Sequence, residues 1–164
     1  MNHKGYTLIE VIVTMLIVAI LLGGASLGYG RYKAVEAENA LEKLASSIDI
    51  TRATTKACAN EVELVIYFKN DKYYADIIEY NQYKDDYNIL NSTSICSKEL
   101  KLSYKETQYS TEFKEITENT KKTIKFNRIT DGFTVDTYCY CFKVNHSSAK
   151  NLYLAYETGK TYLE

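Results

Sequence analysis

The sequence predicts an α+β protein in which one long amino-terminal α-helix packs on an antiparallel β-sheet head. Three observations favour this fold class. The 20 residues from Val11 to Gly30 carry no charged side chain, residues 31–57 repeat apolar side chains at helical spacing, and strand-like alternation begins at Val62. The 164 residues contain no Pro that would interrupt the helix, and this length favours a single domain.

The predicted helix spans residues 6–57 and has two chemically different halves. In the second half an apolar stripe recurs at alternating three- and four-residue steps, the spacing of one helix face. Its members are Ala34, Ala37, Leu41, Leu44 and Ile48. This half should lie on the head. Residues 6–30 are apolar over about 20 positions, enough to cross a bilayer core, so we expect them to form a membrane and assembly segment.

The head, residues 58–164, is expected to be rich in β-strands. Apolar residues recur at every second position over 62–68, and the polar tetrapeptide 69–72 is typical of a turn into a return strand at 73–78. Further strands are predicted at 100–104, 123–126, 133–144, 151–156 and 161–163, with turns at 130–132, 145–148 and 157–160. The polar segment 81–97 is predicted to be a long loop.

The first ten residues indicate to which cellular compartment the protein is directed. The segment formed by residues 1–5 is short and polar, and Lys4 gives it one positive charge. Glu10 is the one acidic residue before Glu36. A carboxylate in an apolar helix is expensive in lipid and functional by default, although a residue snorkelling at the membrane edge is the bland alternative. A secretory signal peptide cut near the small residues at 23–28 fits less well, because of Glu10 and because its apolar region would be about 7–15 residues long.

The heptapeptide Gly5-Tyr6-Thr7-Leu8-Ile9-Glu10-Val11 resembles the processing motif of type IV prepilins and pseudopilins, commonly Gly-Phe-Thr-Leu-Ile-Glu. A basic leader precedes it, an apolar helix follows, and Tyr6 keeps the aromatic ring. The resemblance implies that a prepilin peptidase removes residues 1–5 by cutting after Gly5, and that the new amine of Tyr6 is methylated. It also implies that Glu10 pairs with the N-terminal ammonium of an adjacent subunit, which offsets the cost of burying both charges.

The same resemblance sets the expected location and partners. The precursor and the mature pool would be single-pass proteins of the cytoplasmic (inner) membrane, and the subunit would then enter an extracellular or cell-surface filament. Its partners would be prepilin peptidase, other pilin or pseudopilin subunits and a membrane assembly platform. The expected role is that of a structural minor pilin or pseudopilin; a major pilin and a DNA-binding minor pilin of a competence filament are the alternatives.

Within these families the head is most similar to the GspH/FimT group of minor subunits. The features that carry this similarity are the helix end at 46–59 leading directly into the strand at 62–68, the segment IKFNRITDGF at 124–133, and the ending NLYLAYETGKTYLE at 151–164. The group shows a Thr-Gly-Arg-like turn near its end. Here Lys160 follows Thr158-Gly159 in place of the Arg.

Net charge gives no general reason to expect a nucleic-acid partner. The chain has 20 Lys+Arg and 21 Asp+Glu, for a formal charge of −1. The carboxyl-terminal third is mildly basic, and Lys121, Lys125 and Lys160 are its candidate DNA contacts. The preceding sixty residues are acidic and would weaken the field of that region, so nucleic-acid binding is possible but not favoured.

Four cysteines in an exported head permit disulfides. Cys58 and Cys96 would be bridged to Cys139 and Cys141, in either order, because neighbours two apart on a strand are at the far edge of disulfide geometry. Free thiols and a zinc site are the alternatives, although the spacing lacks paired C-x₂-C knuckles. No phosphate loop, nucleophile elbow or paired-carboxylate motif is present, so we expect neither an enzyme nor a cofactor or metal.

Overall fold

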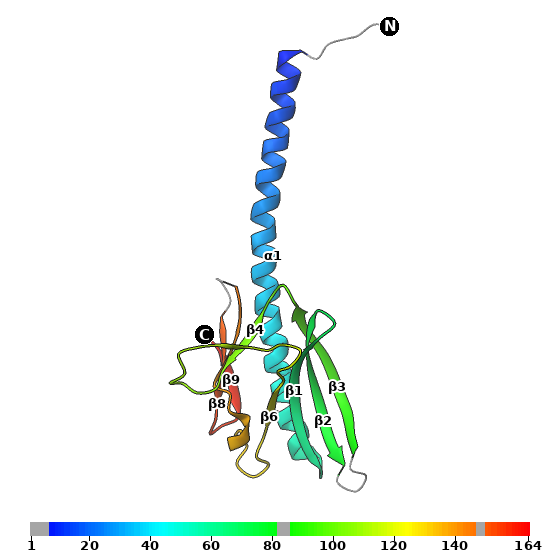
Figure 1. Ribbon diagram of the computed structural model, residues 1–164, viewed down its shortest axis with the longest axis vertical. Coiled ribbons are helices and arrows are strands. Elements are labelled where there is room, and N and C mark those ends of the chain that lie inside the picture. Colours follow the sequence, from blue (N-terminus) through cyan, green and yellow to red (C-terminus); the bar gives the residue numbers. More distant parts are fainter. Residues whose placement is uncertain (1–6, 82–85, 147–149) are drawn as a thin grey trace.

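The computed structural model describes residues 7–81, 86–146 and 150–164; within these ranges the side chains of residues 24–28 and 135 are not described. Helix α1 (Leu8–Ala57) forms the long axis of the molecule. Its amino-terminal half projects away from the head and its carboxyl-terminal half lies within it (Figure 1). The fold is α+β, with antiparallel sheets after a long helix, which confirms the predicted class.

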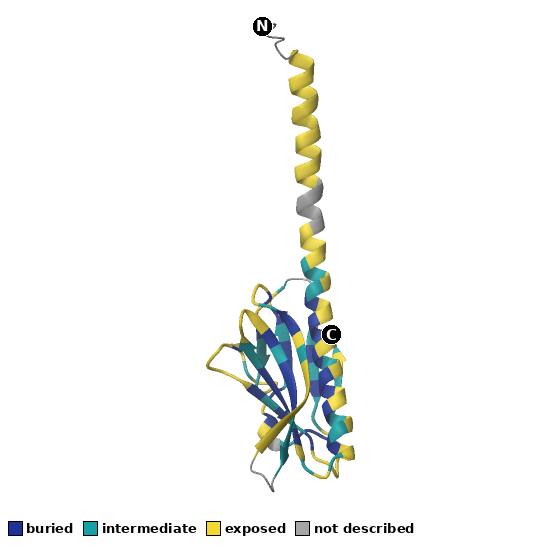
Figure 2. Cartoon of the chain, turned by 90° about the vertical axis from the view of Figure 1, so that its right-hand side faces the viewer, coloured by how far each residue is buried: buried dark blue, intermediate teal, exposed yellow. Residues whose placement is uncertain are grey.

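The carboxyl-terminal half of α1 buries the predicted stripe from Ala37 onward, while Ala34 is half-buried. Ala37, Leu41, Leu44 and Ile48 are fully buried, and this face is turned toward the sheets (Figure 2). The buried face continues beyond Ile48 through threonines rather than aliphatic residues. Their hydroxyls donate to carbonyls one turn back, from Thr51 to Ser47 at 2.7 Å and from Thr55 to Thr51 at 2.8 Å. These bonds satisfy polar groups that would otherwise be costly to bury.

Nine strands follow α1 in the described residues, and they form two antiparallel sheets instead of one. The four-stranded sheet has the order β3-β2-β1-β6 and contains β1 (Glu61–Lys69), β2 (Lys72–Asn81), β3 (Asp86–Ser97) and β6 (Lys122–Lys125). The five-stranded sheet has the order β5-β4-β7-β8-β9 and contains β4 (Leu102–Lys105), β5 (Lys114–Glu115), β7 (Cys141–Val144), β8 (Asn151–Ala155) and β9 (Lys160–Leu163). Helix α1 contacts strands of both sheets.

The core lies where the two sheets meet the helix. Leu64 of β1, Phe142 of β7 and Leu152 of β8 are fully buried there beside the helix stripe. Each such side chain stabilises the fold by about 1.5–3 kcal/mol relative to leaving it in water. The β1–β2 hairpin closes as predicted, with Asn70 and Asp71 at φ 50° and 61° between the paired Lys69 and Lys72, the geometry of a two-residue type I′ turn.

The loop predicted at 81–97 is wrong. Among its described residues, Asn81 ends β2 and residues 86–97 form β3, which pairs with β2 along its length. Residues 86–92 are all exposed because this strand is the edge of its sheet, so no alternation of apolar and polar residues marks it. Near its end a register shift beside Tyr73 and Tyr74 brings Ile95 and Cys96, which are adjacent in sequence, both into the interior.

The single strand predicted at 133–144 is also wrong. A 3-10 helix η1 (Val135–Thr137) and a left-handed Tyr138 interrupt it, and only 141–144 form β7. Tertiary hydrogen bonds fix the break, since the Thr137 hydroxyl accepts from the Lys125 backbone N–H at 3.1 Å and Lys122 Nζ donates to the Tyr138 carbonyl at 2.6 Å. The turn predicted at 145–148 lies partly outside the described residues.

Candidate assembly site at the amino-terminal helix

The amino-terminal half of α1 exposes apolar side chains on all its faces. Leu8 is 79% exposed, Met15 69% and Leu22 67%, and no face between residues 8 and 22 is covered by the head (Figure 2). A helix that is hydrophobic all round is stable when something surrounds it. Within the described residues, no helix combines the length and the mean hydropathy needed to cross a membrane.

Glu10 takes part in capping the amino-terminal end of this helix. The Thr7 backbone N–H donates to the Glu10 carboxylate at 2.8 Å, the Thr7 hydroxyl donates to it at 3.0 Å, and the Glu10 backbone N–H donates to the Thr7 hydroxyl at 3.4 Å. This is a capping box, which satisfies amides left unpaired in the first turn. The carboxylate therefore has a local partner in the isolated chain. The processing residues Gly5 and Tyr6 lie outside the described residues.

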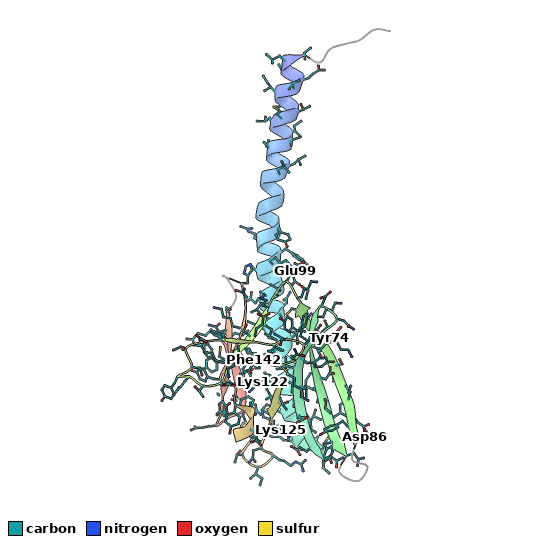
Figure 3. All side chains as sticks on the ribbon, in the orientation of Figure 1. Tyr74, Asp86, Glu99, Lys122, Lys125 and Phe142 are labelled. Atoms are coloured by element: carbon teal, nitrogen blue, oxygen red, sulfur yellow. The ribbon has the colours of Figure 1, made fainter. Side chains whose placement is uncertain are left out.

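A group of ion pairs ties α1 to the head where the helix emerges. Lys33 donates to Glu36 at 3.3 Å and to Glu99, which follows β3 (Figure 3). The hydrogen bond to Glu99 raises the pKa of Lys33 well above its usual value. On the other side Lys150 pairs with Glu38 at 3.3 Å. Lys33 and Glu36 are half-buried, whereas Glu99, Glu38 and Lys150 are exposed. Such surface pairs are individually weak, but together they attach the projecting helix to elements on two sides.

The loop of residues 127–132, here called the helix-end loop, fastens the other end of α1. Arg128 donates from Nε to the Thr55 carbonyl at 3.0 Å and from its terminal nitrogen to the Asn60 carbonyl at 2.9 Å. Asp131 receives Lys56 at 2.5 Å and Arg52 at 3.6 Å. The loop thus satisfies a carbonyl left unpaired in the last helical turn and pairs two cations of α1.

The helix-end loop is held in turn by the β8–β9 turn. A Cβ on Gly132 would lie 2.5 Å from the Tyr156 carbonyl oxygen, and one on Gly159 would lie 2.0 Å from the Asp131 carbonyl oxygen. Phe133 packs against Phe126 and Tyr156, with ring centroids 4.7 and 5.6 Å apart. The segments 124–133 and 151–164 therefore meet at the helix end.

The structure does not bring the three candidate DNA lysines together. Lys125 lies on β6, where Glu61 and Glu63 hold it at 2.6 and 3.1 Å (Figure 3). Lys121 lines a hollow with Glu118 beside the β1–β2 hairpin. Lys160, on β9 of the other sheet, lines a separate hollow beside Arg52 and Lys56. Arg52 and Lys56 are already paired with Asp131, so the hollow beside Lys160 offers little unpaired positive charge.

All four cysteines are free thiols in this structure. Cys96, Cys139 and Cys141 are buried and Cys58 is half-buried. Burial raises the pKa of Cys96 to about 12 and that of Cys141 to about 11, and raises the pKa of Cys139 further. Disulfide pairing stays a prediction. Among the described residues no three potential ligands from His, Cys, Asp and Glu lie together.

The family described as "Prokaryotic N-terminal methylation motif" matches residues 1–26. Comparisons with curated proteins and with solved structures return no match. The matched residues contain the Gly5-to-Glu10 motif and the start of α1, and the rest of the chain has the long-helix-and-sheet architecture of a pilin. The motif at residues 1–26, together with this architecture, supports a precursor of the type IV pilin and pseudopilin kind.

Proposed function

We propose that the chain is a structural minor pilin or pseudopilin of a type IV pilus-like filament. A prepilin peptidase would cut it after Gly5 and methylate Tyr6, and residues 6–30 would hold it in the cytoplasmic membrane until an assembly platform adds it to the filament. The observation that carries the proposal is the uncovered apolar helix surface between residues 8 and 22. Neighbouring subunits that present the same surface would cover it, as lipid would beforehand.

Glu10 sets the register in which the apolar helices of neighbouring subunits pack on one another. Each subunit contributes one ammonium at its new amino terminus and one carboxylate at Glu10, and packing the helices places both in apolar surroundings. An unpaired buried charge is strongly destabilising, so the favoured stagger is the one in which they meet. Because Thr7 already donates twice to Glu10, the carboxylate would be held in position, with lone pairs left for an incoming ammonium.

Three variants separate the charge of Glu10 from its capping role. Glu10→Gln keeps an acceptor for the Thr7 hydrogen bonds but removes the charge. Glu10→Val removes both. Thr7→Ala keeps the carboxylate but removes the side-chain cap, at a cost of about 1 kcal/mol in helix stability.

We expect all three variants to be inserted in the membrane and cleaved, because none adds a charge to the helix and a charged side chain is the costly group in lipid. The two Glu10 variants should be depleted from sheared filaments, while Thr7→Ala should be incorporated nearly as well as the wild type. Immunoblots of membrane and filament fractions measure incorporation, and intact mass measures cleavage and methylation. Normal incorporation of Glu10→Gln would refute the pairing, and loss of incorporation in Thr7→Ala alongside normal Glu10→Gln would assign Glu10 a capping role instead.

A separate measurement tests processing. Native protein should begin at Tyr6, and Gly5→Val should leave an uncut precursor in the membrane. A native amino terminus at Met1, or after the small residues near 25, would refute the motif assignment. Abundance in purified filaments distinguishes the minor-subunit proposal from a major pilin, which would be the principal component.

A further inference from the structure

We propose that an open cleft on the five-stranded sheet binds an organic cation of the alkylammonium or guanidinium class. The cleft has a volume of about 680 Å³. It lies where the β4–β5 connection, residues 138–140 and the β8–β9 hairpin converge, away from the apolar half of α1. The residues that define its chemistry are Tyr138, Tyr140, Tyr156, Tyr162, Glu106 and Glu157.

Tyrosine rings supply the first part of the argument. Tyr140 meets Tyr153 edge-on with centroids 5.6 Å apart, and Tyr153 stacks on Tyr162 at 5.3 Å and an interplanar angle of 17°. These contacts fix the rings along one side of the cleft, while Tyr162 remains 47% exposed. The face of an aromatic ring carries negative potential and attracts ammonium and guanidinium groups within about 6 Å of the centroid.

The charge of the lining supplies the second part. Two carboxylates and, in the described part of the chain, no basic side chain line the cleft. Lys114 engages Glu106 at 2.8 Å, and Lys122, which does not line the cleft, donates from its Nζ to the Tyr138 backbone carbonyl. Glu157 is exposed and makes no ion pair with another described residue. A bound cation would pair with Glu157, whereas a neutral ligand would leave that charge without a partner.

Backbone strain at the cleft supplies the third part. Tyr138 is left-handed, with φ 35° and ψ 49°, a conformation that a residue with a Cβ rarely adopts. Its side chain is 56% exposed, so burial of the ring does not offset the strain. The surrounding structure imposes the conformation through the Lys122 bond to the carbonyl and through Thr137, which is bonded to Lys125. Strained residues that their neighbours hold in place concentrate at ligand sites.

The test uses the full mature chain in a neutral polyoxyethylene detergent, because sugar or phosphocholine detergents would themselves compete for such a cleft. The probes are choline, acetyl-arginine methylamide, 3,3-dimethylbutan-1-ol and methyl glucoside. The third has the shape of choline without its charge. Calorimetric or NMR titration should show binding of at least one cation, with the uncharged probes weaker by about tenfold or more. Choline binding would favour free amines as the ligand, and binding of the arginine amide alone would favour a basic peptide.

Variants connect binding to the cleft. Tyr138→Gly removes a ring and relieves the strained backbone, so it should weaken cation binding by about tenfold while the melting temperature stays the same or rises. Glu157→Gln should weaken the cations and leave the neutral probes unchanged. Tyr87→Leu, which changes a tyrosine of similar exposure on the other sheet, should bind like the wild type. Binding of neither cation, equal binding of choline and its neutral isostere, or undiminished binding by Tyr138→Gly would overturn the proposal.

Discussion

Replacing Gly159 with Ala should destabilise the head more than any ordinary surface substitution. Gly159 has φ +62°, and a Cβ there would lie 2.0 Å from the Asp131 carbonyl oxygen and 3.1 Å from the Phe126 ring. The left-handed conformation costs an Ala about 1–2 kcal/mol, and forcing extra volume into a packed site costs about 1–3 kcal/mol. The sum, about 2–5 kcal/mol, is a large part of the 5–15 kcal/mol that stabilises a typical domain.

Thermal unfolding of the full chain, followed by circular dichroism, measures this effect. For a chain of this length a loss of about 3 kcal/mol lowers the melting temperature by roughly 10 °C. Gly23→Ala is the matched control, because Gly23 lies in α1 with nothing within 4 Å of its Cβ position, and Ala stabilises a helix interior by about 1 kcal/mol relative to Gly.

Gly159→Asn separates the two causes. Asn tolerates the left-handed region but brings the same Cβ, so it should recover only the conformational part of the loss. A melting temperature of Gly159→Ala within about 2 °C of the wild type would show that the β8–β9 turn moves away freely and that its contact with the helix-end loop does not stabilise the head.

Three further predictions follow from the ion pairs, the thiols and the lysines. Lys56 and Arg52 hold the pKa of Asp131 below its usual 3.8, so the stability lost in Asp131→Asn should be measurable at pH 7, where the carboxylate is charged, and should shrink as the pH falls below 3.8 and the carboxyl of the folded chain takes up its proton; an unchanged difference at low pH would contradict this. In reduced native protein an alkylating reagent at pH 8 should modify Cys58 before the three buried thiols, whose pKa values are raised, and uniform labelling would contradict this. In protein from an oxidising compartment, non-reducing mass spectrometry should show two disulfide bridges, and four free thiols there would contradict that prediction. At about 150 mM salt the full chain should bind duplex DNA weakly or not at all, whereas sub-micromolar binding lost on charge reversal of Lys121, Lys125 and Lys160 would favour the DNA-uptake alternative.

The elements predicted correctly are those whose burial follows a period. The stripe from Ala37 to Ile48 and the alternation from Val62 to Phe68 both face the core. The spacing of these apolar residues therefore predicts which side chains are buried. The β1–β2 turn was predictable for a related reason, since Asn70 and Asp71 tolerate positive φ. Local chemistry and burial agree in all three segments.

The errors occur where neighbours decide the structure. Strand β3 is stabilised mainly by hydrogen bonds to β2 and exposes both faces over 86–92, so no sequence period marks it. The break at 135–140 depends on two hydrogen bonds between residues distant in sequence. Lys122 Nζ donates to the Tyr138 carbonyl and the Lys125 backbone N–H donates to the Thr137 hydroxyl, and no sequence pattern reveals either pairing. The aromatic cleft was missed for the same reason, because its tyrosines come from separate segments and the strain at Tyr138 exists only in the folded chain.

The helix-end loop shows which part of the carboxyl-terminal signature the fold needs. The Thr158-Gly159-Lys160 turn departs from the Thr-Gly-Arg pattern at its last residue. Gly159 is the residue of this turn on which the packing depends, because its positive φ and its closeness to Asp131 make any side chain there costly. Lys160 is exposed beside Arg52 and Lys56, and those two cations, not Lys160, pair with Asp131. Lys in place of Arg therefore leaves the packing of the loop intact, and the closeness of Gly132 to Tyr156 and of Gly159 to Asp131 adds a link between the end of α1 and the five-stranded sheet, beside the direct contacts of α1 with β7, β8 and β9.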